Sequence, residues 1–157
     1  MRASAWGHAL EQDMVAVRIS PDLDWSVVAS PEYLSRAGTP QRPADLLRHQ
    51  TILYRFVSSG GVPAWRFKVE GEDLLLHPEK AVVVNDTTVI AEFARQGLGL
   101  AYLPDMEIAS DLAQGRLQRV LQKYVASTSG LFIYFPQRSQ TQPKLRAFIE
   151  AATATPE

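Results

Sequence analysis

Short apolar runs, separated by polar segments that contain Gly or Pro, recur along this chain. Runs of this length favour β-strands, and a run that is apolar throughout favours a strand covered on both faces. Trp25–Ala29 and Ala81–Val84 are of this second kind and are predicted to be buried. The predicted strands are Val15–Ile19, Trp25–Ala29, Ile52–Phe56, Ala64–Val69, Asp73–His77, Ala81–Val84, Leu98–Leu103, Leu117–Leu121 and Leu131–Phe135.

Helices are predicted where a capping residue or a proline precedes apolar residues at helical spacing. Ser, Asn and Asp accept hydrogen bonds from the first amides of a helix, Pro suits its first turn, and Gly ends it. In the second helix, Leu46 and Leu47 are expected to face inward, and the last helix carries an apolar stripe. The predicted helices are Pro31–Ala37, Pro43–His49, Thr87–Gln96, Pro104–Gln114 and Pro143–Ala152.

The most regular segment runs from Ala81 to Leu103, as strand, helix and strand. A crossover of this kind joins parallel strands of one sheet. The sequence therefore predicts an α/β fold with a mixed, mostly parallel sheet.

Composition limits the function. The 16 Lys and Arg residues are scattered and the formal net charge is −1, whereas nucleic-acid binders concentrate basic residues on one face. DNA binding by this chain alone is not expected. No apolar run reaches the roughly 18 residues of a membrane span, and the first residues lack the apolar core of a secretion signal. We expect a cytoplasmic protein without membrane contact.

The sequence offers no recognisable catalytic set. It contains no cysteine and no Gly-x-Ser-x-Gly turn for a nucleophile. His8, His49 and His77 stand in dissimilar polar contexts and are expected to be surface or loop residues. No His or carboxylate spacing suits a metal, and Gly97-x-Gly99 fits a helix stop and close packing better than a dinucleotide loop. We predict no enzyme activity, no cofactor and no metal.

Two places end a strand and begin a helix with short polar residues, namely Ser30 and Asn85-Asp86-Thr87. Ligands of α/β sheets gather where strands end, and helix amino termini there suit a small anion. The same residues are also common helix caps without any ligand. We expect Ser30 and Asn85 to lie side by side, with a small organic anion bridging them.

Three segments resemble the effector-binding domain of LysR-type transcription regulators, covering roughly Leu10 to Ala152. They are VVASPEYLSRAGTPQRPADLLRHQTILYR, VVVNDTTVIAEFARQGLGLAYLPDMEIASDLAQGRLQRVL and FIYFPQRSQTQPKLRAFIEAA. The resemblance implies a fold like the type 2 periplasmic binding proteins, with two α/β lobes and a small-molecule cleft between them. It also implies that Trp65 and Phe67 belong to the core. The implied ligand contacts are Ser30, Tyr54, Phe56, Asn85, Asp86 and Thr87.

The resemblance also implies an organisation. Residues 1–23 correspond to a remnant of the first lobe, residues 24–133 to the second lobe, and residues 134–157 to a strand and helix that return to the first lobe. Regulators of this family bind DNA through a winged helix-turn-helix domain, which is absent from these residues. Partners expected from the resemblance are a small-molecule effector and, through the apolar stripe of the last helix, a second copy in a homodimer or larger assembly.

Three alternatives remain open. One is a solute-binding protein of the same fold, which would need an export signal. Another is an enzyme on this fold, such as the prephenate dehydratases, which would need an acid–base set. The third is a dimerisation or interaction fragment that binds no ligand.

Overall fold

The computed structural model describes residues 13–154, and the chain divides into two compact units. The larger unit comprises Asp24–Ala126, and the smaller one combines the chain up to Leu23 with the chain from Ser127 onward. Residues 127–133, which the sequence analysis assigns to the second lobe, are thus grouped with the smaller unit.

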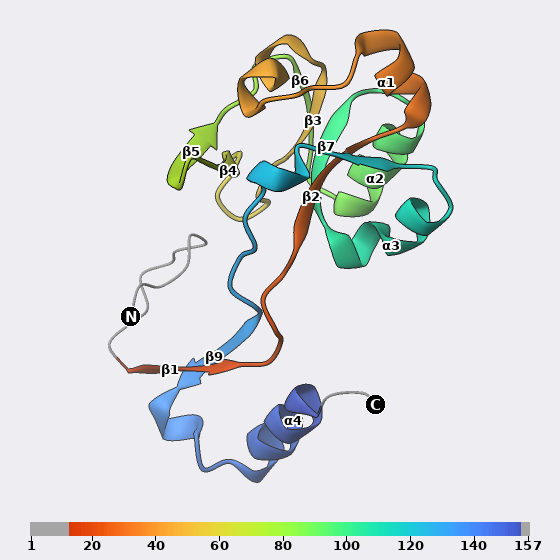
Figure 1. The fold of residues 1–157 in the computed structure, drawn as a ribbon. Coiled ribbons are helices and arrows are strands. Elements are labelled where there is room, and N and C mark those ends of the chain that lie inside the picture. Colours follow the sequence, from red (N-terminus) through yellow and green to blue (C-terminus); the bar gives the residue numbers. More distant parts are fainter. Residues whose placement is uncertain (1–12, 155–157) are drawn as a thin grey trace. The chain divides into compact units, whose positions relative to one another are not determined.

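The larger unit is built on a mixed five-stranded sheet (Figure 1). Strand β3 pairs in parallel with β6 and β7, whereas β2 pairs antiparallel with β7 and β8. The sheet is mixed, as predicted, but it is not mostly parallel, because two of its four strand pairs are antiparallel. In sheet order the strands are β6 (Ala81–Val84), β3 (Thr51–Tyr54), β7 (Leu100–Pro104), β2 (Trp25–Ala29) and β8 (Gln118–Val120).

Both faces of this sheet are covered, which explains why its inner strands are largely apolar. On one face, Val28 and Ile52 pack against helices α2 (Thr87–Arg95) and α3 (Asp105–Ala113). On the other face, Val27 and Leu53 pack against α1 (Pro31–Ala37), the 3₁₀ helix η1 (Pro43–Arg48) and the hairpin of β4 (Trp65–Val69) and β5 (Glu72–Leu76). Figure 1 shows the α2–α3 pair and the hairpin on opposite sides of the sheet. Trp65 and Phe67 are buried, which confirms their predicted place in the core.

The strand–helix–strand crossover is confirmed, with β3 inserted between its two strands. Helix α2 connects β6 to β7, and both strands run parallel to β3. Gly97 ends the connection with a positive φ of 75°. A Cβ on Gly99 would lie 2.5 Å from the carbonyl oxygen of Gln50. This pair of glycines therefore serves as a helix stop and a close approach of two backbones, as predicted.

Two packing predictions were wrong. Strand β6 was expected to be buried, but it is an edge strand and Val83 is 37% exposed. An apolar run does not reveal whether a strand has one neighbour or two. Leu47 was expected to face inward, but it is 48% exposed while Leu46 is fully buried. The segment is a 3₁₀ helix with three residues per turn, so adjacent residues point about 120° apart and cannot share one face.

A buried carboxylate holds α3 against α2. The Asp111 side chain is only 4% exposed and accepts a hydrogen bond from Arg95 Nη1 at 2.8 Å and another from Arg116 Nε at 2.6 Å. Arg95 also contacts the exposed Glu92 at 2.8 Å. Asp111 is the only member of this cluster that has lost almost all its water, so its two arginine partners must replace that hydration.

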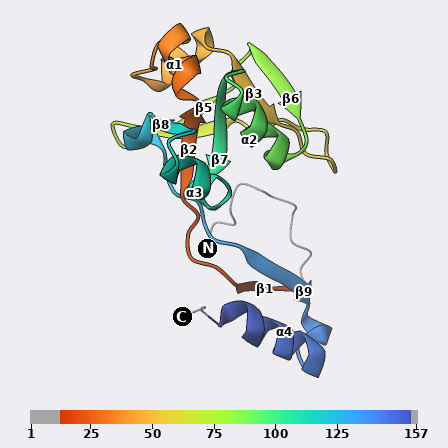
Figure 2. The ribbon, with the colours of Figure 1, turned by 90° about the vertical axis from the view of Figure 1, so that its right-hand side faces the viewer.

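The smaller unit contains a two-stranded antiparallel ribbon of β1 (Met14–Arg18) and β9 (Phe132–Pro136), visible in Figure 2. The Oγ atom of Ser20 accepts a hydrogen bond from the amide of Leu131 at 2.7 Å beside this ribbon. Helix α4 (Pro143–Thr153) has no buried residue, and Phe148 on its apolar stripe is 59% exposed. Two further short 3₁₀ helices are η2 (Gln122–Tyr124) in the larger unit and η3 (Gln137–Ser139) in this one. No helix among residues 13–154 has the length and apolar composition that a bilayer crossing requires.

We predict that Asp111→Asn lowers the free energy of unfolding by about 2 kcal/mol, because it removes the buried negative charge that Arg95 and Arg116 share. Glu92→Gln is the matched control. It removes the same charge from an exposed i,i+3 pair and should cost much less, because water screens that pair. Urea unfolding of both variants measures the difference, and equal losses would contradict a special role for the buried carboxylate.

Ser30 caps α1, since its Oγ accepts from the amide of Tyr33 at 3.2 Å. We predict that Ser30→Ala lowers the free energy of unfolding by about 1 kcal/mol, whereas Ser30→Gly costs only a few tenths. Thermal or urea unfolding tests this pair. A stability unchanged in the alanine variant would show that the cap contributes nothing.

Candidate functional site

The predicted ligand contacts lie at opposite ends of the five-stranded sheet. Because β2 runs antiparallel to β7, its last residues reach the edge at which β3, β6 and β7 begin. Ser30 follows β2 at that edge. Asn85 follows β6 at the other edge, where the parallel strands end.

The register gives the separation of these two residues. Val28 lies opposite Ala101, so Ser30 is level with Gly99 and with the residues that precede β3 and β6. Asn85 is five residues further along β6, which at about 3.3 Å per residue places it roughly 17 Å away along the strand direction. The expectation that Ser30 and Asn85 lie side by side is therefore wrong.

The other five predicted residues do share one edge, at the carboxyl ends of β3 and β6. The amide of Arg55 donates to the carbonyl of Val84 at 2.8 Å, which joins the two strand ends. The rings of Tyr54 and Phe56 meet edge to face with centroids 5.4 Å apart. Both rings are half-buried, so each keeps a surface that another molecule can contact.

Asn85, Asp86 and Thr87 differ in what their side chains do. The Asp86 carboxylate accepts from the amides of Thr88 and Val89, at 2.8 and 3.2 Å, and so caps α2. Asn85 is exposed and Thr87 is half-buried. An anion placed on the helix terminus would meet the charge of Asp86, which already holds two of the first amides. The terminus therefore suits neutral polar groups better than the anion expected from the sequence.

The sequence analysis missed a polar cluster at the same edge, where β7 ends. The fully buried Ser26 donates through Oγ to Asp105 Oδ1 at 2.5 Å and accepts from Arg119 Nε at 3.0 Å. Arg119 Nη2 also donates to Asp105 Oδ2 at 2.7 Å. The available signal was the single hydroxyl inside the apolar run of β2, because a buried hydroxyl requires hydrogen-bond partners.

An aromatic cluster supports this edge from the hairpin side. The Tyr102 ring centroid lies 5.1 Å from that of Trp25 and 5.6 Å from that of Trp65. Burial raises the pKa of Tyr102 to about 12, so its hydroxyl stays protonated and donates to the carbonyl of Arg66 at 3.4 Å. Tyr102 thus joins β2, β7 and the hairpin through side-chain contacts.

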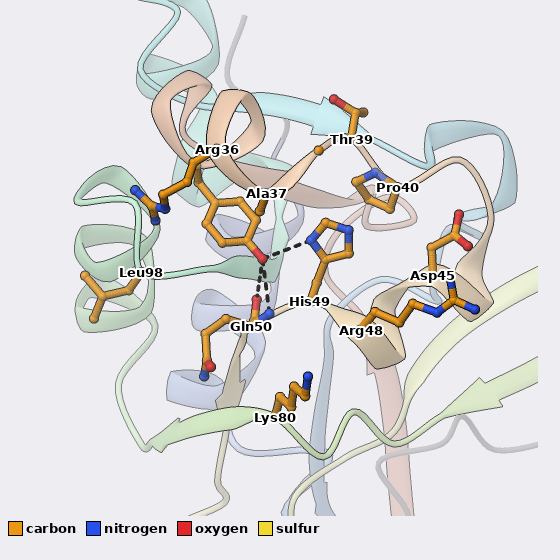
Figure 3. Close-up of a pocket in the computed structure, with 12 residues that line it drawn as sticks. Arg36, Ala37, Thr39, Pro40, Asp45, Arg48, His49, Gln50, Lys80 and Leu98 are labelled. Carbon is orange, nitrogen blue, oxygen red and sulfur yellow. Dashed lines mark hydrogen bonds between the residues drawn. The ribbon is translucent and has the colours of Figure 1, made fainter.

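The amino-end edge carries Ser30 and two surface cavities. Ser30 is 4% exposed, with its Oγ engaged in the α1 cap, so little of it is left for a ligand. One cavity of about 630 Å³ is lined by Ser30, Glu32, Glu92, Arg95, Gln96 and Arg116, among others. The other, of about 640 Å³, lies between α1, η1 and Lys80 (Figure 3). Residues 13–154 hold no group of three or more His, Asp or Glu side chains arranged for a metal ion.

Comparison with known proteins gives a family match over residues 5–156, to the LysR substrate binding domain. A putative transcriptional regulator of Pseudomonas aeruginosa is 34% identical over 149 residues, which are 95% of this chain and 49% of that protein. The HTH-type transcriptional regulator PgrR of Escherichia coli is 32% identical over 144 residues, 92% of this chain and 48% of that protein. The chain thus spans about half the length of these curated relatives, which are transcriptional regulators and not enzymes.

Solved structures show the same fold. The regulatory domain of CrgA, a LysR-type regulator of Neisseria meningitidis, has a TM-score of 0.72 at 23% identity and covers 94% of this chain and 71% of its own. The full-length Vibrio cholerae virulence activator AphB has a TM-score of 0.74 at 22% identity, with coverages of 95% and 50%. The α/β fold of the type 2 periplasmic-binding-protein kind is therefore confirmed. With its fold and three sequence segments matched by the same family, the chain belongs to the LysR substrate-binding domain family.

Proposed function

We propose that this chain is the effector-sensing module of a LysR-type transcription regulator and that it binds a small organic molecule. The observation that carries the proposal is the family match over residues 5–156. The module contributes no catalysis. DNA contact falls to a winged helix-turn-helix domain outside these residues, in keeping with the net charge of −1. Because such regulators act where bacterial DNA lies, we place the module in the cytoplasm.

We assign effector contacts to the carboxyl ends of β3 and β6. Ligands of α/β sheets gather outside these strand ends, and ligand sites combine apolar walls with a few polar groups. Tyr54 and Phe56 supply the ring surface there, and Asn85 and Thr87 supply an amide and a hydroxyl. Asp86 acts by capping α2 and so by orienting its two neighbours. Ser30 has no part in this site because it lies at the other end of the sheet.

The capping carboxylate also restricts the effector. A carboxylate on the effector is repelled by Asp86 if it approaches the amides of α2, so an organic acid must turn its charge toward the Asn85 amide instead. A neutral polar effector meets no such repulsion. The affinities of organic acids and of neutral polar compounds for this edge can therefore be compared directly.

We predict that aromatic acids or their neutral amides, titrated into the ¹⁵N-labelled chain, shift amide signals of residues 54–57 and 85–88. Asn85→Ala should weaken the binding of such a compound about tenfold, because a lost polar contact costs about 1 to 1.5 kcal/mol. Ser30→Ala is the control at the opposite edge and should leave affinity unchanged. Signals that shift only around residues 33–50, or equal effects of both variants, would contradict the assigned site.

The apolar stripe of α4 supports a second proposal, that the chain self-associates. Leu145, Ile149 and Ala152 are only half-buried and Phe148 is 59% exposed, so association would remove this surface from water. We predict a dimer or larger assembly in sedimentation at micromolar concentration, and a shift toward monomer in Phe148→Asp. Ala147→Asp introduces the same charge at an exposed position off the stripe and should not dissociate the assembly. A monomeric wild-type chain would reject the proposal.

A further inference from the structure

The cavity between α1 and η1 is bordered by more positive than negative groups. Arg36, Arg48 and Lys80 line it, and Asp45 is the single acid among its lining residues. Figure 3 shows the Lys80 amine directed toward the side of His49 and Arg48, with Gln50 beside it. The cavity volume of about 640 Å³ is large enough for a small ligand.

The carboxylate of Asp45, the one acid of this lining, already accepts hydrogen bonds from the backbone. The Asp45 Oδ2 atom accepts from the amides of Gln41 and Arg42, at 3.0 and 2.9 Å. These bonds, first from Arg42 and then from Gln41, hold the pKa of Asp45 below its usual range, so it stays ionised. Arg36 donates to the carbonyl of Gly97 at 2.8 Å, whereas within residues 13–154 no such bond to the backbone is seen for Arg48 or Lys80, the other two cations of the lining.

The hydrogen bonds around His49 can form whether its imidazole is neutral or charged. The hydroxyl of Tyr33 accepts from the amide of Gln50 at 3.1 Å and lies 2.9 Å from His49 Nδ1 and 3.3 Å from the carbonyl of Gln50. When the imidazole is neutral, Tyr33 donates its proton to Nδ1. When the imidazole is charged, Nδ1 donates to Tyr33 and the hydroxyl turns to the Gln50 carbonyl. Both nitrogens then carry protons, and the second nitrogen points away from Tyr33 in Figure 3.

We propose that this cavity binds a small divalent oxyanion, held by Arg48 and Lys80 with His49 donating from the nitrogen opposite Tyr33. The site lies at the amino-end edge of the sheet and is independent of the effector site proposed above. Phosphate, sulfate and dicarboxylate groups share the chemistry that these donors recognise. The titratable and charged groups that line the cavity with His49 are Tyr33 and Arg36 of α1, Asp45 and Arg48 of η1, and Lys80 before β6.

The pH dependence has a definite sign. Burial lowers the pKa of His49, and the charge of Asp45 acts in the opposite direction. The imidazole is therefore neutral at pH values above its pKa, where Arg48 and Lys80 hold the anion without its help. As the pH falls through this pKa His49 adds one more positive charge, and a bound anion stabilises it. Oxyanion affinity should rise on acidification.

Sulfate is the probe of choice because its charge stays constant over the range in which His49 titrates. We expect sulfate, titrated at constant ionic strength against chloride, to shift amide signals around residues 36–50 and 80. Binding should tighten about two- to fivefold as the pH is lowered from about 8 through the pKa of His49, the effect of one added charge in a solvent-exposed site. Succinate at the higher pH tests whether a dicarboxylate occupies the same position.

Lys80→Gln should weaken sulfate binding about two- to fivefold, and His49→Gln should remove the pH dependence while the shifts remain. Lys68→Gln removes an exposed charge on β4 away from the cavity and serves as the matched control. Equal losses of sulfate affinity in the two lysine variants would mean that sulfate responds only to the overall charge of the protein, and this result would overturn the site. So would shifts outside the cavity or an unchanged pH profile in His49→Gln. Asn85→Ala should leave sulfate binding intact, which keeps this outcome separate from that of the effector site.

Discussion

The direction of β2 is the constraint on which the arrangement of polar sites depends. The two parallel pairs place the ends of β3, β6 and β7 at one edge, but β2 runs the other way between β7 and β8. A helix that follows β2 therefore begins at the edge where the other three strands start. Two strand-to-helix junctions that look alike along the chain, at Ser30 and at Asn85, are separated by the length of the sheet.

Local features were readable from the sequence because they depend on neighbouring residues alone. The bounds of Trp25–Ala29 and Ala81–Val84 agree with the structure, and Ser30 and Asp86 cap the helices that follow them. The burial of Trp65 and Phe67 on one face follows from their alternation. Strand direction, edge position and 3₁₀ geometry depend on partners far along the chain or on small differences in backbone angle. These features produced the errors at Ser30, at β6 and at Leu47.

The candidate site shows the same division. Tyr54, Phe56 and the Asn85–Thr87 segment meet at one edge because β3 and β6 pair in register. The predicted crossover joins β6 to β7 and does not specify that β3 lies between them. The cluster of Ser26, Asp105 and Arg119 joins residues up to 93 positions apart, and no local pattern predicts it. Residue type alone also could not show whether a short polar residue caps a helix or binds a ligand. The bonds from Thr88 and Val89 show that Asp86 serves as a cap, which leaves its neighbours for a ligand.

Helix α2 is the element that connects the two edges. It begins at Asp86 beside the carboxyl ends of β3 and β6 and ends near Arg95, about 13 Å away for a helix of this length. Arg95 is tied to the buried Asp111, so this end of α2 is fixed to α3. A ligand at one edge influences the other only if it binds two arrangements of such an element with different affinity. The ion pairs around Asp111 oppose any sliding of α2 along α3, because a displaced carboxylate would lose its partners without regaining water. The larger unit therefore favours two sites that act independently, unless a ligand supplies enough binding energy to break this cluster.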